Sequence, residues 1–300
     1  MSLVVAVVGP TATGKSALSL ALAHELGGEV VNADSMQLYR GMDIGTAKLT
    51  VEEREGVPHH VLDIWDVTDP ASVAEYQRLA RSAVDDIFAQ GRVPLLVGGS
   101  GLYVRAVLER FEFPGTDPAL RASLEAELGA VGPGPLYARL AAVDPGAAAG
   151  ILPSNGRRIV RALEVVELTG RGFVATLPDP APYYPSIQLG VDLDTAALDG
   201  RIAARVRQMW QRGFVAEVRA LAAGGLRDGR TASRALGYQQ ILRHLAGECS
   251  DEQAAADTVQ ATRRFVRRQR SWFRRDERIR WLDGGVPDLV PTALASVRAQ

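Results

Sequence analysis

The segment GPTATGKS at residues 9–16 constrains the fold of this 300-residue chain more than any other feature. It follows the apolar run LVVAVV, which is typical of a buried strand, and precedes a helical pattern over residues 15–26 that two glycines end. A glycine-rich loop in this setting directs backbone N–H groups and a helix N-terminus at phosphate oxygens. The lysine would add a point charge, and the serine hydroxyl could hold Mg²⁺. We therefore expect a P-loop for a pyrophosphate-bearing ligand, formed by Gly9, Pro10, Thr11, Ala12, Thr13, Gly14, Lys15 and Ser16.

The rest of the chain alternates between strand and helix signals before it changes character. Strands are expected at residues 29–32, 92–97 and 187–193, and a helix at residues 74–90. This alternation predicts an α/β fold with a parallel-sheet core and helices on both faces. Residues 117–169 show only helical periods, and residues 195–300 are mostly helical again. We predict a P-loop α/β core with a helical C-terminal part (1–112 and 184–300) and an all-α insertion (113–183).

Composition excludes several classes of protein. Hydrophobic residues make up 47% of the chain and charged residues 23%, which argues against a disordered chain. The single cysteine, Cys249, cannot form an internal disulfide, and no apolar run approaches the ~18 residues of a membrane span. We expect a cytoplasmic monomer that does not engage a membrane.

Basic residues are unevenly placed and of unequal kind. Residues 261–280 contain nine arginines and two acidic residues, whereas the whole chain carries a net charge of −1. This segment predicts either a helix that binds an anionic partner or a solvated helix with an apolar core face. In both cases the spacing of Phe265, Arg268 and Trp272 predicts that these residues form a stripe on the side of the helix that faces the protein core. Only two of the 34 basic residues are lysines, Lys15 and Lys48, and such positions suit a compact ammonium rather than a guanidinium.

The P-loop indicates a ligand but not a reaction. The positions of carboxylates after the strands narrow the range of possible reactions. The buried strand at residues 92–97 ends in GGSG, without the carboxylate that helps P-loop nucleotidases hold their metal. Instead Asp34 follows the strand at residues 29–32, and ligands of open α/β sheets bind beyond the carboxyl ends of strands. Asp34 could act as a general base on a nucleophile. A helix N-cap or an indirect Mg²⁺ contact explains the spacing equally well.

Several longer motifs resemble the tRNA dimethylallyltransferase family. They include NADSMQLYRGMDIGTAK, VPHHVLDI, PLLVGGSGLY, RRIVRALEVVELTG, RVRQMWQRGFVAEV, RALGYQQI and TRRFVRRQRSWFRR, in this order after the P-loop. The resemblance implies transfer of an isopentenyl group from dimethylallyl pyrophosphate to the exocyclic N6 of the adenine that follows the anticodon in tRNA. It also implies a P-loop core with an inserted helical domain that grips the anticodon stem-loop.

The resemblance assigns roles to individual residues. Lys15, the loop amides, Mg²⁺ on Ser16 and Arg205 would stabilise the departing pyrophosphate, and Asp34 would accept the proton of the amine. Arg205 without the resemblance is an ordinary solvated helix residue. Ser100 joins the catalytic group and stands where the family usually has threonine; Arg157 stands where glutamine is common. The implied tRNA-binding residues are Asp34, Ser35, Met36, Gln37, Ser100, Arg121, Arg157, Arg158, Arg161, Arg234, Gly237, Tyr238, Gln239, Arg264, Arg267 and Arg268.

Two other functions remain open from the sequence. A P-loop kinase of a small metabolite explains the phosphate loop but not the arginine-rich segment. An RNA-binding module that uses a nucleotide as a switch explains that segment but leaves Asp34 without a role. The transferase chemistry needs Mg²⁺, the allylic donor and tRNA, but no ATP.

Overall fold

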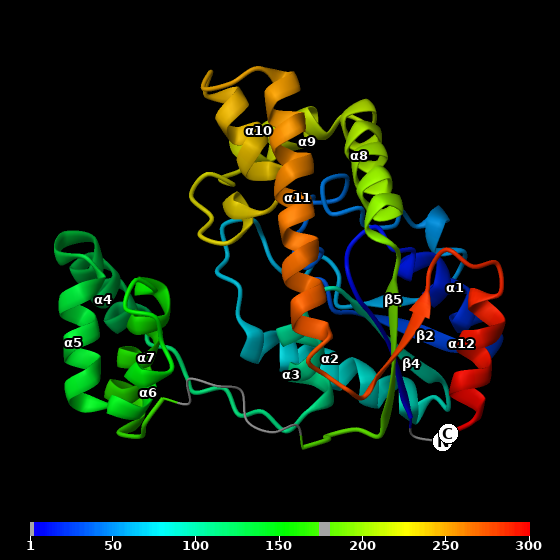
Figure 1. Cartoon of the computed structure of the whole chain (residues 1–300), viewed down its shortest axis with the longest axis horizontal. Coiled ribbons are helices and arrows are strands. Elements are labelled where there is room, and N and C mark those ends of the chain that lie inside the picture. Colours follow the sequence, from blue (N-terminus) through cyan, green and yellow to red (C-terminus); the bar gives the residue numbers. More distant parts are fainter. Residues whose placement is uncertain (1–2, 174–180) are drawn as a thin grey trace. The chain divides into compact units, whose positions relative to one another are not determined.

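The computed structural model describes residues 3–173 and 181–300, which include one parallel sheet of six strands (Figure 1). The strand order is β3-β2-β4-β1-β5-β6. The strands are β1 (Val4–Val8), β2 (Gly28–Asn32), β3 (His59–His60), β4 (Val93–Gly98), β5 (Ser186–Asp192) and β6 (Ile279–Asp283). The predicted α/β class with a parallel sheet is therefore confirmed.

The strand register brings the carboxyl ends of the central strands to one edge of the sheet. Val8 at the end of β1 pairs with Gly98 of β4 on one side and Gly190 of β5 on the other. Asn32 at the end of β2 pairs with Val97. The loops that follow β1, β2, β4 and β5 therefore leave the sheet at the same edge, where ligands of such sheets bind.

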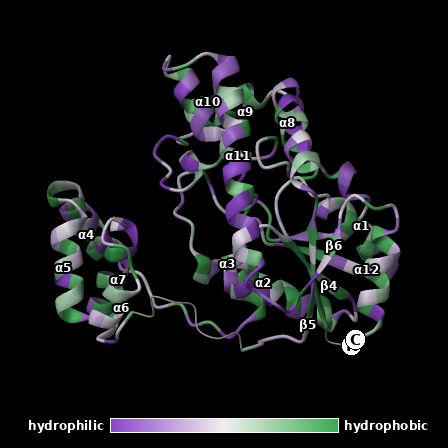
Figure 2. Ribbon diagram, viewed as in Figure 1, coloured by the Kyte–Doolittle hydropathy of each residue, from purple (hydrophilic) through white to green (hydrophobic). Residues whose placement is uncertain are grey.

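Helices cover both faces of the sheet because β1 is apolar on both sides. Val4, Ala6 and Val8 belong to a core with α2 (Val73–Ala89) and α3 (Gly101–Leu108). Val5 and Val7 face the other way and pack with α1 (Lys15–Leu26) and α12 (Leu289–Arg298). Figure 2 shows hydrophobic residues concentrated in the strands and in the helix sides that face them. Burial on both faces explains the continuous apolar strand sequence.

Four further helices follow β5 in the same unit: α8 (Thr195–Gln211), α9 (Phe214–Ala223), α10 (Tyr238–Leu245) and α11 (Asp251–Phe273). Two short 3₁₀ helices, Glu52–Arg54 and Ala232–Arg234, lie in the connections. The long α11 packs against α8 and α10 and extends to α3 beside the sheet (Figure 1). Among the described residues, no helix is both long and apolar enough to cross a bilayer.

The remaining helices form a second compact unit with its own core. This unit spans Arg110–Ala181, whereas the rest of the chain forms the first unit. Its helices are α4 (Pro118–Val131), α5 (Pro133–Val143), α6 (Pro145–Ala149) and α7 (Gly156–Thr169). Leu136, Leu140 and Ile159 lie in their shared core with 0% exposure. Residues 174–180 of the predicted insertion lie outside the described residues.

The C-terminal region differs from the sequence prediction in two respects. The arginine-rich helix ends at Phe273, and the chain then forms the edge strand β6, which the run of arginines concealed. The predicted inward stripe of Phe265, Arg268 and Trp272 is also wrong. The buried side of α11 instead carries Thr258, Ala261, Val266, Gln269 and Phe273. The two stripes are adjacent on the helix, and the buried polar side chains of Thr258 and Gln269 form hydrogen bonds that offset their burial.

Candidate active site

The P-loop follows β1 and depends on glycine at its entrance and exit. Gly9 has a φ of +127°, and a side chain there would collide with the backbone of Val191 in β5. Gly14 has a φ of +100° and directly precedes α1. Both conformations are accessible to glycine at little cost. The predicted loop thus has the strand, turn and helix context that phosphate binding requires.

Lys15 opens α1, and its ammonium group donates a hydrogen bond of 2.5 Å to the carbonyl of Pro10. Burial lowers the pKa of Lys15 to about 8; the charge of Asp34 opposes this change, and that of Arg205 adds to it. A lysine in a poorly solvated position, with another cation nearby, favours an incoming anion because the anion restores the stability of the charged form.

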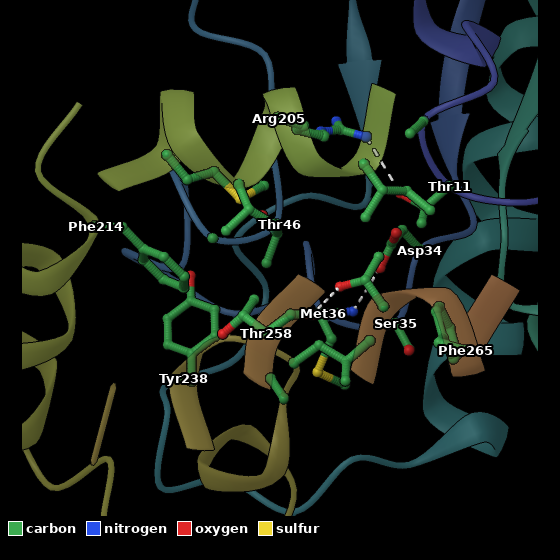
Figure 3. A pocket seen from close by; sticks show the side chains of 18 of the residues that line it. Thr11, Asp34, Ser35, Met36, Thr46, Arg205, Phe214, Tyr238, Thr258 and Phe265 are labelled. Carbon is green, nitrogen blue, oxygen red and sulfur yellow. Dashed lines mark hydrogen bonds between the residues drawn. The ribbon is translucent and has the colours of Figure 1, made fainter. Parts of the chain in front are cut away.

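Two adjoining cavities open at the carboxyl edge of the sheet. The first, of about 440 Å³, is bordered by the P-loop and by polar side chains that include Lys15, Ser16 and Gln37. The second, of about 310 Å³, is bordered by apolar side chains that include Met209, Phe214 and Phe265 (Figure 3). Five residues border both cavities: Thr11, Ala12, Asp34, Thr46 and Arg205. A ligand with a charged end and an apolar end would therefore have its junction beside Asp34 and Arg205.

Asp34 is held in a turn directly after β2. Its Oδ1 accepts a hydrogen bond of 2.9 Å from the N–H of Met36, and its own N–H donates to Asn32 Oδ1. No helix begins at this point, so the interpretation of Asp34 as a helix N-cap is wrong. Asp34 instead borders both cavities.

Ser100 supports this turn from the end of β4. Its Oγ accepts a hydrogen bond of 3.1 Å from the N–H of Ser35 and donates to Ser35 Oγ at 3.1 Å. Ser100 also borders the apolar cavity. The structure therefore brings Ser100 to the predicted site, in contact with the segment that carries Asp34.

Arg205 lies on α8 and points to the P-loop (Figure 3). Its Nη1 donates a hydrogen bond of 3.2 Å to Thr11 Oγ1. Burial lowers the pKa of Arg205 below its ordinary value, and the charge of Asp34 acts in the opposite direction. The alternative of an ordinary solvated helix residue is therefore wrong.

A loop over residues 36–48 forms another wall, and sequence reasoning missed what holds it. Gln37 Nε2 donates to the carbonyl of Thr46 at 3.1 Å. Glu217 on α9 accepts hydrogen bonds from the backbone N–H groups of Asp43, Ile44 and Gly45, and from the hydroxyl of Tyr238. These partners are more than 170 residues apart except for Tyr238, so no local motif indicates them.

Residues expected to contact tRNA near α10 have different degrees of exposure. Arg234 and Gln239 are exposed, and Arg234 borders the apolar cavity. Tyr238 is buried, and burial together with Glu217 raises its pKa well above the ordinary value. Gly237 has a φ of +83°, and a side chain there would press on Phe214. The last two residues therefore have evident packing roles.

The arginines of α11 fall into two groups. Arg263 pairs with Asp199, and Arg270 pairs with Asp192. Arg264, Arg267 and Arg268 are exposed, and no acidic partner is seen for them in residues 3–173 and 181–300. Figure 2 shows α11 as hydrophilic along much of its length. The second group is available to bind phosphate groups.

Two arginines of the second unit, Arg121 and Arg161, bind one buried carboxylate. Glu164 is 0% exposed and accepts hydrogen bonds from Arg121 and Arg161. Burial acts to raise the pKa of Glu164, but these hydrogen bonds hold it below the ordinary value. Arg157 and Arg158 are exposed at the start of α7. The sequence-predicted residues thus lie in both units, while the P-loop, Asp34, Ser100 and Arg205 converge in the first.

Fold and site together define the class: a P-loop α/β protein with a bipartite site, no carboxylate directly after β4 and a carboxylate after β2. Comparisons with known proteins give the family. The model of the IPP transferase family matches residues 37–276. The chain belongs to this family.

Curated relatives are similar over nearly the full chain. The chain is 77% identical to a tRNA dimethylallyltransferase from Salinispora arenicola, over 99% of this chain and 86% of the relative. It is 65% identical to the protein of that name from Thermobifida fusca, over 99% of this chain and 95% of the relative.

Solved structures agree with this assignment. A tRNA isopentenylpyrophosphate transferase from Bacillus halodurans has a TM-score of 0.74 and 40% identity, with coverage of 100% of this chain and 95% of that one. A eukaryotic dimethylallyltransferase acting on tRNA has a TM-score of 0.84 and 27% identity, with coverage of 99% and 77%.

Proposed function

We propose that this chain transfers a dimethylallyl group from dimethylallyl pyrophosphate to N6 of the adenine on the 3′ side of the anticodon in tRNA, and releases pyrophosphate. The observation that carries the proposal is the junction of a polar and an apolar cavity at Asp34 and Arg205. The pyrophosphate suits the P-loop side, and the five-carbon group suits the apolar side. Family membership supports the same reaction.

The reaction breaks the bond between the allylic carbon and the pyrophosphate oxygen. The electron pair remains on the oxygen, where Lys15, Arg205 and the P-loop amides stabilise the developing charge. The lone pair of the adenine N6 forms the new carbon–nitrogen bond. The amine proton passes to the Asp34 carboxylate, which then releases it to solvent.

The residues of the polar cavity suit Mg²⁺ bound mainly through the ligand. No group of three or more His, Cys, Asp or Glu side chains that could hold a metal is found among the described residues. Ser16 borders the polar cavity and offers one hydroxyl oxygen. Mg²⁺ retains water and often binds through substrate phosphates with few protein ligands. Bound in this way, it would neutralise charge on the pyrophosphate.

The adenine must leave its stack to reach a site between a sheet edge and helices, so we infer that the nucleotide is flipped out of the loop. The exposed arginines of α11, together with Arg157 and Arg158 of the second unit, would bind the RNA backbone. Gln37 would read an adenine edge after its amide leaves Thr46. The enzyme would act as a monomer in the cytoplasm, where unmodified tRNA occurs.

A single incubation tests the function. Wild-type protein, Mg²⁺, dimethylallyl pyrophosphate and unmodified tRNA are mixed, and the digested nucleosides are analysed by mass spectrometry. We expect isopentenyl-adenosine that depends on protein and donor and that forms about 10²–10⁴-fold more slowly with the Asp34→Asn variant. Absence of the product with an acceptor tRNA, while tRNA binding is intact, would contradict the proposal.

A further inference from the structure

A glutamine on α11 links two of the strand-end loops that form the site. Gln269 is only 6% exposed. Its Oε1 accepts a hydrogen bond of 3.1 Å from the N–H of Thr11 in the P-loop, and its Nε2 donates one of 2.9 Å to the carbonyl of Gly99 after β4. A side-chain amide supplies a donor and an acceptor at fixed separation, so it suits two such partners at once.

The surrounding chain is built to receive this amide. A side chain at Gly99 would collide with Gln269 Nε2, so glycine gives the glutamine its space. The next residue, Arg270, binds the carboxylate of Asp192 at 2.8 Å and the carbonyl of Leu193, both at the end of β5. The helix α11 is thereby fixed to the chain that follows β1, β4 and β5.

Thr11 connects this glutamine to the reacting groups. Its backbone N–H is held by Gln269, and its hydroxyl accepts the hydrogen bond from Arg205. Thr11 and Arg205 border both cavities, whereas Gln269 borders neither. Gln269 is therefore placed to act through Thr11 rather than on a ligand directly.

We propose that Gln269 is a positioning residue, which sets the P-loop at Thr11 and, through the Thr11 hydroxyl, the guanidinium of Arg205. Its role in turnover rests on the proposed function, because it concerns the departure of pyrophosphate. Its role in binding pyrophosphate does not. Loss of the amide leaves the buried Gly99 carbonyl and the partly buried Thr11 N–H without this partner, so both the P-loop and the guanidinium shift.

The Gln269→Met variant tests this role, since methionine has a similar length and no hydrogen-bonding amide. We expect Mg²⁺–pyrophosphate to bind about 5- to 100-fold more weakly in calorimetry, the range for a buried polar group left unpaired. The KM of dimethylallyl pyrophosphate should rise and kcat should fall. The KM of tRNA should remain within twofold.

The Phe273→Leu variant is the matched control. Phe273 lies one turn further along α11, is 3% exposed and belongs to the apolar core. We expect it to lower the melting temperature, with pyrophosphate affinity and kcat unchanged. Equal losses of affinity in both variants at equal stability would overturn the proposal, because Gln269 would then only hold the helix in place.

Other outcomes separate this inference from the proposed function. Wild-type affinity and turnover in Gln269→Met would overturn the inference while leaving the transfer reaction intact. Conversely, a wild-type protein that binds pyrophosphate but transfers nothing would contradict the proposed function. Weaker pyrophosphate binding in Gln269→Met would then still support the positioning role.

Discussion

Lys15 and Lys48 are the only lysines in the chain, and they occupy contrasting environments within the same unit. The ammonium of Lys48, which is 6% exposed, donates to the Tyr39 carbonyl at 3.0 Å, to Asp43 at 2.6 Å and to Asp63 at 2.5 Å. Three donors thus meet three oxygens. Lys15, by contrast, has the Pro10 carbonyl as its one hydrogen-bond partner among the described residues.

The difference separates a charge used by the fold from a charge reserved for a ligand. Two carboxylates compensate the charge of Lys48. These contacts help to hold the loop that carries Thr46, together with the hydrogen bond that Thr46 accepts. Among the described residues, no carboxylate forms a direct ion pair with Lys15, and burial lowers its pKa to about 8. In the proposed function, an incoming pyrophosphate would supply the negative charge that Lys15 lacks. The comparison predicts that substitution of Lys15 lowers activity, whereas substitution of Lys48 lowers stability.

The largest effect tests whether Asp34 serves the substrate or merely compensates Lys15. The Asp34→Asn variant should lose about 10²–10⁴-fold in kcat, the usual range for removal of a general base. Pyrophosphate affinity should rise slightly or stay constant, because a negative charge has left the site. Single-turnover transfer and calorimetry measure the two quantities. Near-normal turnover together with a lower pKa of Lys15 would reduce Asp34 to a partner of the lysine.

The Lys15→Met variant tests the reserved charge. Removal of one group that stabilises developing charge should lower kcat about 10²- to 10³-fold. Stability should not fall, because folding lowers the pKa of Lys15 from 10.5 to about 8. The cost of the protonated ammonium to folding therefore grows as the pH falls from 10.5 and is complete below about pH 8. Denaturant unfolding at pH 7 measures this. A clear loss of stability would place Lys15 in the same category as Lys48.

The Lys48→Met variant should show the opposite pattern. It leaves the Tyr39 carbonyl without its donor and two carboxylates without their cation, which should cost about 1–3 kcal/mol of unfolding free energy. Pyrophosphate affinity of the folded protein should change less than in Lys15→Met. Chemical denaturation and calorimetry on the same preparation check this. An affinity loss as large as that of Lys15→Met would remove the distinction between the two lysines.

A pH titration sharpens the comparison without changing the fold. Because the pKa of Lys15 in the free protein is about 8, and a bound anion raises it, binding of the donor should take up a proton above about pH 8. Affinity should therefore decline as pH rises through 8. Calorimetry in two buffers of different ionisation enthalpy measures the uptake. The Lys15→Arg variant is the control, since a guanidinium stays protonated throughout. Proton uptake that persists in this variant would show that a group other than Lys15 takes up the proton.

The parts of the site differ in how far the sequence could predict them. The P-loop and Asp34 follow directly after β1 and β2, so local motifs and the strand-end rule were enough to place them. Arg205 required the family resemblance, because helical periodicity does not say which side of α8 meets the P-loop. Gln269 and Glu217 were missed because their partners lie far along the chain, 258 residues away for Gln269 and Thr11.

The smallest predicted effect extends the comparison to the arginines of α11. Arg267 is exposed, whereas Arg263 pairs with Asp199 at 3.4 Å on the same helix. Arg267→Ala should reduce the slope of log affinity for tRNA against log salt concentration by about one, as expected for the loss of one phosphate contact. Arg263→Ala should change the slope by less, because its charge already has a protein partner.

Fluorescence anisotropy with a labelled anticodon stem-loop, at several salt concentrations, measures both slopes. Turnover at saturating tRNA should remain close to wild type in Arg267→Ala, since this side chain borders neither cavity. Equal slopes for the two variants would mean that an ion pair within the protein does not withhold an arginine from RNA. The distinction between charge used by the fold and charge reserved for a ligand would then apply to Lys15 and Lys48 but not to the surface of α11.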